Sequence, residues 1–273
     1  MTKQRIIITG ANGFIGSHLV SKLVNKYHVI GIDHHSTGKS GNYHQINLLD
    51  LDVEQFQHKW EGDVFIHLAS VMANAQNLND ISVVNQNNTM SFNAANLAVQ
   101  LKCKHFINLS SSSVYPNING IFTEDSIIDP SQNTDAFYGL SKFNSEVIID
   151  KLLMGRLKVT HLRSSMIYGE GVNSGRIWPV MEKELKEQNT VTVYGNGERL
   201  INQLHVNSLL SIIENVIVRS ITGKYNIKDE TISTKKLSER IISQKGNPES
   251  KIVLINEGNM SKFELDNSKY NSL

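Results

Sequence analysis

Short apolar runs alternate with longer stretches of helical periodicity through residue 153 of the chain. The runs predict buried strands at residues 5–8, 28–32, 64–68 and 105–109, with a short additional strand at 44–47. The periodic stretches predict helices at residues 14–23, 53–60, 80–101 and 136–153. Strands that alternate with helices through short connections form parallel sheets with helices on both faces. We therefore predict an α/β fold built on a doubly wound parallel sheet.

The first strand passes into the first helix through a glycine-rich turn, residues 9–16, with the sequence TGANGFIG. Its three glycines permit a tight turn and let backbone N–H groups and the positive helix end approach a pyrophosphate. The alternative is a glycine turn that only tightens helix–sheet packing. The strand before the turn and the helix after it favour a Rossmann-type dinucleotide site. The residues expected to line it are Gly10, Asn12, Gly13, Phe14, Ile15 and Gly16.

An acidic residue, Asp33, ends the second strand about 20 residues after the glycine turn. A carboxylate at this place accepts hydrogen bonds from an adenosine ribose and repels a 2′-phosphate. We therefore expect NAD as the cofactor and regard NADP as less favoured, although Lys39 and the pair His34–His35 lie near enough to soften that preference. Residues that follow other strands are expected to lie beside the cofactor as well. These are Asn47, Leu48, Leu68, Ala69 and Ser70.

Composition narrows the class of protein. The 27 Lys and Arg residues against 26 Asp and Glu residues give a net charge of +1, which provides no basic footprint for nucleic acid. No apolar run approaches the ~18 residues of a membrane span, and the opening residues lack a secretory apolar region. We therefore expect a cytoplasmic protein with no nucleic-acid and no membrane partner.

Cys103 and His67 are of types that act as nucleophiles or metal ligands, but we expect both to be core residues. Cys103 is the only cysteine, so no internal disulfide forms, and it has no evident activating partner. We expect it to be a buried apolar side chain. His67 has no second ligand at zinc-type spacing, so we expect a core histidine and no metal site.

A candidate acid–base pair lies on the helix expected at 136–153. Tyr138 and Lys142 are four residues apart and therefore project from one face. An ammonium beside a phenol favours the phenolate and lowers the pKa of the tyrosine, which brings it closer to use as a base near neutrality. The serine run 110–113 follows the strand 105–109, where open sheets bind ligands. For Tyr138 and Lys142 alone, the alternative is an ordinary Tyr–Lys pair at the surface. For the serine run alone, the alternative is a solvated loop.

After residue 163 the regular alternation of strands and helices loosens. Helices are expected at 176–188, 206–218 and 236–242, and strands at 190–194 and 225–227. The chain is therefore divided into a dinucleotide-binding Rossmann domain, 1–163, and a small C-terminal α/β region that caps the substrate, 164–202 and 219–273. Residues 203–218 are expected to pack back on the first domain.

Taken in order, these motifs resemble the extended short-chain dehydrogenase/reductase family, specifically its NAD-dependent nucleotide-sugar epimerase/dehydratase branch. The resemblance covers nearly the whole chain and is most specific where the glycine turn is combined with Tyr138 and Lys142. The other matching segments are 32–38, 67–70, 85–89, 110–115, 162–163, 168–169, 194–198 and 205–206. The resemblance also implies a homodimer formed through the helices expected at 80–101 and 136–153.

The resemblance implies a role for each matching residue. Tyr138 is expected to take a proton from a sugar hydroxyl while hydride leaves the same carbon for the nicotinamide, and Lys142 to hold the cofactor ribose. Ser111 is expected to hydrogen-bond the reacting oxygen, and Ser112 is the alternative because the serine run leaves the register ambiguous. Asn85 is expected to support the cofactor or a structural water.

Departures from the family pattern narrow the substrate. Ser112 and Ser113 stand where the family's 4,6-dehydratases carry the Asp–Glu pair that expels water, so dehydration is not expected. Met166 stands in place of an Asn, and Ile201 in place of an Arg that grips a nucleotide diphosphate. Either Arg176 or Arg199 is then expected to hold the diphosphate, unless the substrate is not a nucleotide sugar. The expected substrate contacts are Ser111, Ser113, Tyr138, Ser165, Arg176 and Arg199.

The sequence therefore predicts an NAD-dependent enzyme that modifies a sugar, most concretely a nucleotide-sugar 4-epimerase that acts by transient oxidation at C4. Two alternatives stay open. The first is an NAD(P)H-dependent 4-keto-sugar reductase or dehydrogenase, which releases its cofactor in each turnover. The second is a catalytically silent dinucleotide-sensing protein with the same fold, since fold alone does not fix function.

Overall fold

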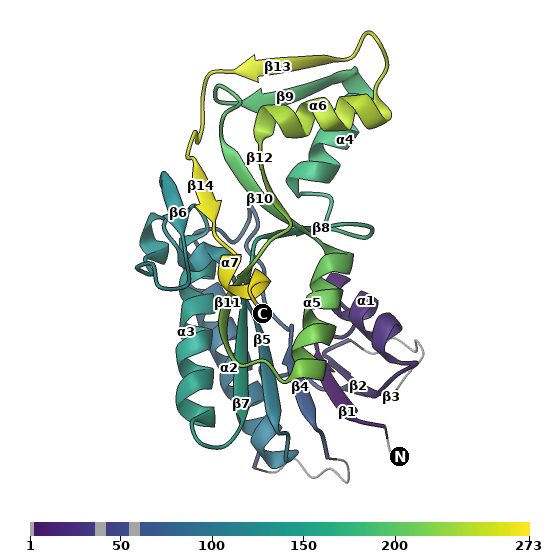
Figure 1. Cartoon of the computed structure of the whole chain (residues 1–273), viewed down its shortest axis with the longest axis vertical. Coiled ribbons are helices and arrows are strands. Elements are labelled where there is room, and N and C mark those ends of the chain that lie inside the picture. The colour runs from purple at the N-terminus through teal and green to yellow at the C-terminus, as the bar shows by residue number, and fades with distance from the viewer. Residues whose placement is uncertain (1–2, 36–41, 55–60) are drawn as a thin grey trace.

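The computed structural model describes residues 3–35, 42–54 and 61–273. Its largest feature is a parallel sheet of seven strands in the order β11-β7-β5-β4-β1-β2-β3 (Figure 1). The strands are β1 (Arg5–Thr9), β2 (His28–Asp33), β3 (Asn42–Gln45), β4 (Val64–His67), β5 (His105–Ser111), β7 (Lys158–Ser164) and β11 (Gly223–Ile227). The predicted doubly wound α/β fold is confirmed.

Helices cover both faces of this sheet. They are α1 (Phe14–Leu23), α2 (Ser82–Gln100), α3 (Ala136–Leu153) and α5 (Val206–Arg219). Successive side chains of a strand point to opposite faces, so Ile6 and Ile8 of β1 pack with α1 and α5, whereas Ile7 packs with α2 and α3. The unbroken apolar run of β1 thus contributes to two cores, and α5 packs on the large sheet.

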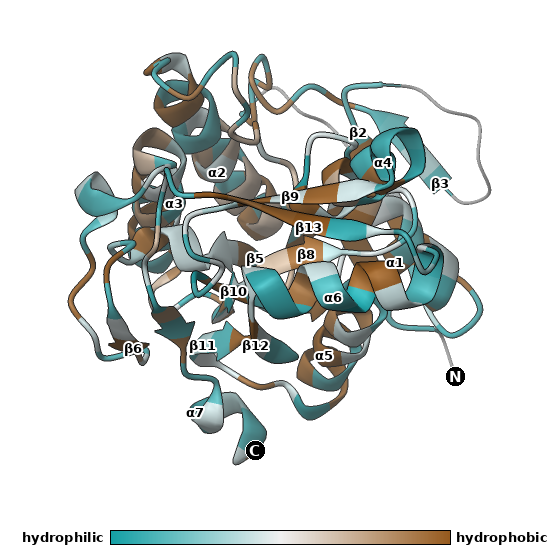
Figure 2. Ribbon diagram, turned by 90° about the horizontal axis from the view of Figure 1, so that it is seen from above, coloured by the Kyte–Doolittle hydropathy of each residue, from teal (hydrophilic) through white to brown (hydrophobic). Residues whose placement is uncertain are grey.

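A smaller α/β region lies over the carboxyl ends of β5 and β7 (Figure 1). Its elements are β8 (Met166–Tyr168), α4 (Ile177–Gln188), β9 (Thr190–Tyr194), β10 (Leu200–His205), β12 (Glu230–Ser233), α6 (Thr234–Lys245) and β13 (Lys251–Ile255). They form a three-stranded sheet, β12-β10-β8, and a parallel pair, β13-β9, around a core of their own. Figure 2 looks down on this cap and shows the hydrophobic residues of β9 and β13 between α4 and α6.

The remaining elements connect the two regions. They are the single-turn helices η1 (Ser112–Val114) and η2 (Pro130–Gln132), the strands β6 (Gly120–Phe122) and β14 (Phe263–Leu265), and α7 (Ser268–Asn271). β6 and β14 pair in parallel, although more than half of the chain separates them in sequence. The C-terminal segment therefore lies against the loop that follows the serine run.

Some elements differ from the sequence-based expectation. The strand expected at 44–47 lies at 42–45, and β11, in the range assigned to the cap, is an edge strand of the large sheet beside β7. The segment 118–134, without expected elements, contains β6 and η2, and β12 and β13 were likewise unexpected. These strands are short, and their partners are distant in sequence, so local periodicity does not reveal them. The helix expected at 53–60 falls outside the described residues except for 53–54, which form a turn.

Candidate active site

The candidate site begins where the order of the large sheet reverses, between β1 and β4. Open α/β sheets bind ligands at the carboxyl ends of strands beside such a switch point. Gly10 follows β1 there with a φ of +68°, and a Cβ built on it would lie 2.9 Å from the backbone nitrogen of Ala69. The turn therefore approaches the backbone that follows β4 so closely that glycine is required at this position.

Gly13 and Gly16 complete the turn for different reasons. A Cβ on Gly16 would collide with the carbonyl oxygen of Gly10, so α1 packs directly on the turn. Gly13 is exposed and is the N-cap of α1, with no side-chain hydrogen bond at that cap. The first N–H groups of a helix have no intrahelical partner, so those of Phe14 and Ile15 suit an anion such as a pyrophosphate.

Asp33 is fixed beside this turn at the end of β2. Its carboxylate accepts hydrogen bonds from the backbone N–H of Asn12 at 2.9 Å and of His35 at 3.1 Å, and it lies 3.2 Å from Nδ1 of His34. The Asn12 side chain donates to the carbonyl of His35 at 2.6 Å. These contacts hold the acid next to the glycine turn, which is the place that recognition of an adenosine ribose requires. Lys39 lies outside the described residues.

The other expected cofactor contacts fall into two groups. Leu68, Ala69 and Ser70 follow β4 and are partly exposed at the same edge of the sheet as the glycine turn. Asn47 is exposed, and its side-chain oxygen accepts a hydrogen bond from the backbone N–H of Leu49 at 3.1 Å. Leu48 is 4% exposed and packs in the core beneath α2, so its side chain supports the fold rather than facing the cofactor site.

Helix α2 brings a different asparagine to the site than expected. Asn85 lies on the exposed face of the helix. Asn87 is 3% exposed, accepts a hydrogen bond from the backbone N–H of Val71 at 2.7 Å and donates to the hydroxyl of Ser141 at 2.9 Å. Asn87, which sequence reasoning missed, therefore connects the segment after β4 to the turn of α3 that carries the tyrosine and the lysine.

Tyr138 and Lys142 are buried near the start of α3. The Lys142 ammonium lies 5.5 Å from the centre of the Tyr138 ring and donates to the carbonyl of Leu109 at 3.1 Å. Ser70, after β4, and Ser111, at the end of β5, lie close enough to the Tyr138 phenol to lower its pKa. The phenol is therefore held between the ends of β4 and β5, beside the switch point.

Burial dominates the protonation of both groups. Desolvation raises the pKa of Tyr138, and the Arg176 guanidinium and the nearby hydroxyls of Ser70 and Ser111 oppose this rise only in part. Desolvation lowers the pKa of Lys142 to about 8. The expected lowering of the tyrosine pKa is therefore wrong for this structure. The ammonium donates to Leu109, and burial disfavours the charged phenolate.

The serine run ends β5 and continues into η1. The Ser111 oxygen accepts a hydrogen bond from the backbone N–H of Ser113 at 3.1 Å, and its hydroxyl donates to the Ser113 oxygen at 3.2 Å. Ser112 begins the turn, and its carbonyl accepts from the N–H of Tyr115 at 3.1 Å. Of the serine run, Ser111 is the residue whose hydroxyl affects the pKa of the Tyr138 phenol.

Two arginines of the cap lie near the start of α3, which carries Tyr138 and Lys142. Arg176 and Arg199 both act on the half-buried carboxylate of Asp135, where they oppose the rise in its pKa that burial causes. The charge of Arg176 also reaches the phenol of Tyr138. Asp135, which sequence reasoning missed, lies just before the first residue of α3. Its position in the sequence could have identified it, because an acid directly before a predicted helix is stabilised by the helix N-terminus.

The remaining substrate candidates face different surroundings. Ser165 is 4% exposed, and within the described chain its hydroxyl has no hydrogen-bond partner. Ile201 is 9% exposed and lies in the cap core, with Met166 packed against that core. Ile201 therefore stabilises the cap and offers no polar group to a diphosphate.

His67 and Cys103 are core residues, as expected. The Nδ1 atom of His67 lies 2.8 Å from the Thr9 hydroxyl, and burial lowers the pKa of this histidine to about 3. Burial raises the pKa of the Cys103 thiol to about 12, which keeps it protonated. Across residues 3–35, 42–54 and 61–273, no cluster of three His, Cys, Asp or Glu side chains could hold a metal ion. None of the helices in those ranges is long and apolar enough to traverse a bilayer.

The geometry fits a dinucleotide at the glycine turn and an acid–base pair beside it. Fold and site together define the class of extended short-chain dehydrogenases/reductases. Within that class, residues 6–227 match the NAD dependent epimerase/dehydratase family, and the chain belongs to this family. The resemblance stated from the sequence motifs is confirmed.

Individual relatives include both epimerases and dehydratases. The chain is 26% identical over 272 residues to dTDP-D-glucose 4,6-dehydratase of Dictyostelium discoideum, covering 88% of this chain and 62% of that protein. It is 28% identical over 243 residues to a putative UDP-glucose 4-epimerase of Methanocaldococcus jannaschii, covering 80% of this chain and 77% of that protein. The chain thus spans less than two thirds of the length of the dehydratase.

A solved structure shows the same fold. UDP-glucuronic acid 4-epimerase from Bacillus cereus, in complex with UDP-glucuronic acid and NAD, superposes with a TM-score of 0.83 at 23% sequence identity. The superposition covers 99% of this chain and 92% of that chain. The cap and the Rossmann sheet of this chain are therefore the fold of that enzyme.

Proposed function

We propose that the chain is an NAD-dependent nucleotide-sugar 4-epimerase that acts by transient oxidation at C4. The observation that carries the proposal is that Tyr138 and Lys142 are buried on one face of α3, with Lys142 donating to the carbonyl of Leu109 near the end of β5, while the open N-terminus of α1 follows β1 in the same sheet. Membership of the family and the presence of 4-epimerases among the relatives support it. A nucleotide sugar is the substrate class, and Arg176 and Arg199 are the groups proposed to hold its diphosphate.

The glycine turn, the α1 N-terminus and Asp33 would hold NAD, with Lys142 on its ribose hydroxyls. The chemistry that NAD supplies when bound is reversible acceptance of a hydride, so that a C4 ketone can form and be reduced again from either face. Burial excludes water from the phenol of Tyr138, and its fixed position turns proton transfer into a step within one complex.

Tyr138 is assigned the proton transfer at the C4 hydroxyl. Its phenolate takes the hydroxyl proton during oxidation, and its phenol returns the proton when the ketone is reduced. The raised pKa of Tyr138 favours the phenol, while the positive charge of Arg176 favours the phenolate. Ser111 donates a hydrogen bond to the same sugar oxygen, which stabilises the charge that develops there.

Dehydration is not proposed, although a 4,6-dehydratase is among the relatives. Expelling water from a keto sugar requires an acid and a base beside the reacting carbons. The two residues after Ser111 are Ser112 and Ser113, which supply hydroxyls and no carboxylate. A hydroxyl is a poor general base near neutrality, so this serine turn supports epimerisation better than elimination.

The experiment that tests the proposal uses the purified chain, NAD and a panel of UDP-, dTDP- and GDP-sugars. We expect NMR to show interconversion of one C4 epimer pair, with no net change in absorbance at the nicotinamide band. Net oxidation or reduction of the cofactor with sugar would instead identify a dehydrogenase or reductase. A dehydrated product would contradict the role given to Ser112 and Ser113.

A further inference from the structure

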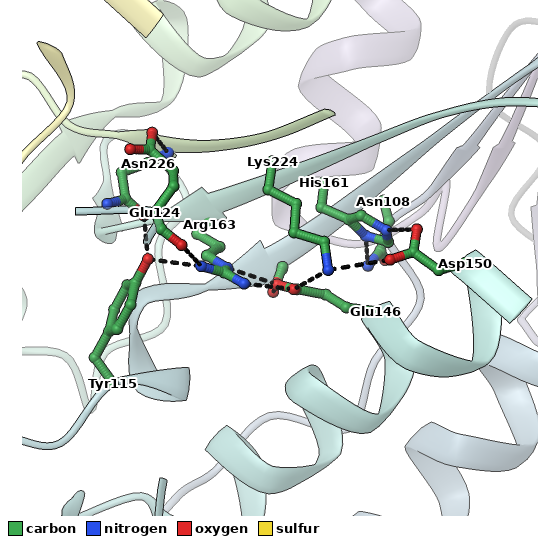
Figure 3. Close-up of polar contacts among 10 residues, drawn as sticks. Asn108, Tyr115, Glu124, Glu146, Asp150, His161, Arg163, Lys224 and Asn226 are labelled. Carbon is green, nitrogen blue, oxygen red and sulfur yellow. Dashed lines mark hydrogen bonds and ion pairs between the residues drawn. The ribbon is translucent and has the colours of Figure 1, made fainter. Parts of the chain in front are cut away.

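A buried ion pair, Arg163 with Glu146, has no role in the proposed mechanism (Figure 3). Arg163 of β7 donates from Nε to Oε1 of Glu146 at 2.9 Å and from Nη2 to Oε2 at 2.8 Å. Arg163 is 3% exposed and Glu146 is fully buried. Burial favours the neutral acid, but hydrogen bonding and the positive charge of Arg163 hold the pKa of Glu146 below its usual value. The pair is therefore ionised.

Glu146 lies on the same face of α3 as the acid–base pair. Tyr138, Lys142 and Glu146 follow one another at intervals of four residues, which is close to one helical turn. All three side chains are buried. A contact that fixes Glu146 therefore fixes the rotation and height of the helix face that presents the phenol.

The other side of the ion pair reaches the serine turn. Arg163 is opposite Ser110 in the ladder between β5 and β7, and the Ser110 hydroxyl donates to Oε1 of Glu146 at 2.6 Å. At the far end of the turn, Nη1 of Arg163 donates to the Tyr115 hydroxyl at 2.7 Å. Both ends of the turn that carries Ser111 are thus attached to the same two charged groups.

Contacts of both its ring and its hydroxyl fix the position of Tyr115. Its ring is fully buried, with the Arg163 guanidinium 5.3 Å from the ring centre. Its hydroxyl donates to Oδ1 of Asn226 at 2.9 Å while accepting from Arg163. The amide of Asn226 donates onward to the carbonyls of Phe122 and Asp266. The hydroxyl of Tyr115 therefore has a donor and an acceptor partner, neither of which is in the candidate site.

We propose that Tyr115 and Arg163 are positioning residues of the active site. Through Glu146 they fix the serine turn relative to α3, which packs on it at Gly139, and so set the position of Ser111 relative to the Tyr138 phenol. The proposal rests on the proposed function, because the Ser111–Tyr138 contact matters for rate only if that pair transfers a proton. Misplacement of reacting groups by about 1 Å can lower a rate by about 10²-fold.

The test uses Tyr115→Phe, which removes one hydroxyl and leaves the ion pair intact. Glu146→Gln and Arg163→Leu are avoided because each leaves an unpaired buried charge that can prevent folding. The matched control is Tyr225→Phe: Tyr225 is also buried, and its hydroxyl donates to the carbonyl of Thr222 at 2.9 Å, away from α3. We expect Tyr115→Phe to lower kcat about tenfold, with KM and NAD affinity within about twofold, and the control to keep the kcat of the unchanged protein.

A double variant distinguishes a positioning role of Tyr115 from a general loss of protein stability. If Tyr115 acts through Ser111, Tyr115→Phe adds little to the loss of kcat caused by Ser111→Ala. If the two losses multiply, or if Tyr115→Phe and Tyr225→Phe lower kcat equally, the positioning role is overturned.

A measurement without turnover keeps the proposal distinct from the proposed function. The backbone N–H groups of Ser113 and Tyr115 are bonded within the serine turn, so their hydrogen exchange reports its order. We expect faster exchange at both sites in Tyr115→Phe and unchanged exchange in α2 and in the control. If the unchanged protein turns over no nucleotide sugar, the proposed function fails, while exchange still decides whether Tyr115 orders the turn. Equal exchange in variant and control overturns the positioning role.

Discussion

At the scale of single residues, the position of a residue on its helix distinguishes neighbouring side chains of the same type. Three asparagines lie within four positions of α2, and Asn87 is the one four residues from both Val83 and Ser91, which are buried. That spacing marks Asn87 as part of the inner face. The pKa of Tyr138 could not be predicted in the same way, because it depends on desolvation by distant elements rather than on the nearby Lys142.

Replacing Tyr138 with Phe removes the phenol and keeps the ring. We expect Tyr138→Phe to lower kcat by at least ~10²-fold, the usual contribution of a positioned acid or base, and to leave NAD affinity nearly unchanged. Steady-state kinetics and calorimetric NAD titration measure the two effects. Tyr194→Phe, at a residue 62% exposed in the cap, is the control. Unaltered turnover in Tyr138→Phe would falsify its assignment as the base.

Asp33 is predicted to determine the choice between NAD and NADP. Asp33→Ala removes a carboxylate that would bind ribose hydroxyls and repel a 2′-phosphate. We expect the ratio of NAD to NADP affinity to fall by about tenfold, as the loss of a hydrogen bond to a charged group implies. Fluorescence titration with both cofactors measures the ratio. If the ratio stays constant in Asp33→Ala, the carboxylate does not contact the ribose.

His67 gives a pH dependence of stability with a definite sign. Burial lowers its pKa from 6.5 to about 3, so between these values the unfolded chain binds the extra proton and the folded chain does not. The free energy of unfolding therefore decreases as pH falls through this range, by up to about 1.4 kcal/mol per pH unit. In His67→Gln we expect a smaller loss of stability between about pH 7 and about pH 5, measured by urea denaturation.

The control for His67 is His28→Gln, which changes an exposed histidine at the start of β2. This variant should keep the pH slope of the unchanged protein. A His67→Gln slope that matches it would show that His67 does not contribute to the acid sensitivity.

At the scale of elements, the glycine turn was predictable because its strand, turn and helix are contiguous. The same holds for α3, whose Tyr138–Lys142 spacing fixes which side chains share a face. The strands β6, β12, β13 and β14 have three to five residues each, and their pairing depends on partners far along the chain. Their positions could therefore be found only from the structure.

The packing of α1 on the glycine turn gives an element-scale prediction. In Gly16→Ala the new Cβ would collide with the carbonyl oxygen of Gly10, so the helix must shift away from β1. We expect a loss of roughly 1–3 kcal/mol in unfolding free energy, as for other overpacked sites, together with weaker NAD binding. Urea denaturation and NAD titration measure these losses.

Gly175→Ala is the control, since its Cβ would meet no atom closer than the Asn173 side-chain oxygen at 3.3 Å. It should lose less stability than Gly16→Ala and retain NAD affinity. Equal effects of the two substitutions would mean that close packing at Gly16 is not what the turn requires.

At the scale of the whole molecule, the outer faces of α2 and α3 remain the predicted dimer surface. Phe92 is 49% exposed on α2, Val147 is 41% exposed on α3, and Met154, the residue directly after α3, is 68% exposed. We expect the protein to sediment as a dimer and Phe92→Glu to shift it to the monomer, because a buried unpaired charge is costly. Val218→Glu, at a residue 69% exposed on α5, should remain dimeric. A monomeric unchanged protein would contradict the prediction.

The pairing of β6 with β14 has a consequence for the order in which the molecule is completed during synthesis. The dinucleotide turn needs only residues up to β4, and domains form from the N-terminus as the chain emerges. The amide of Asn226, which supports Tyr115, lacks one of its acceptors until the carbonyl of Asp266, 40 residues further along the chain, has been synthesised. A nascent chain can therefore form its glycine turn long before the serine turn has its final support.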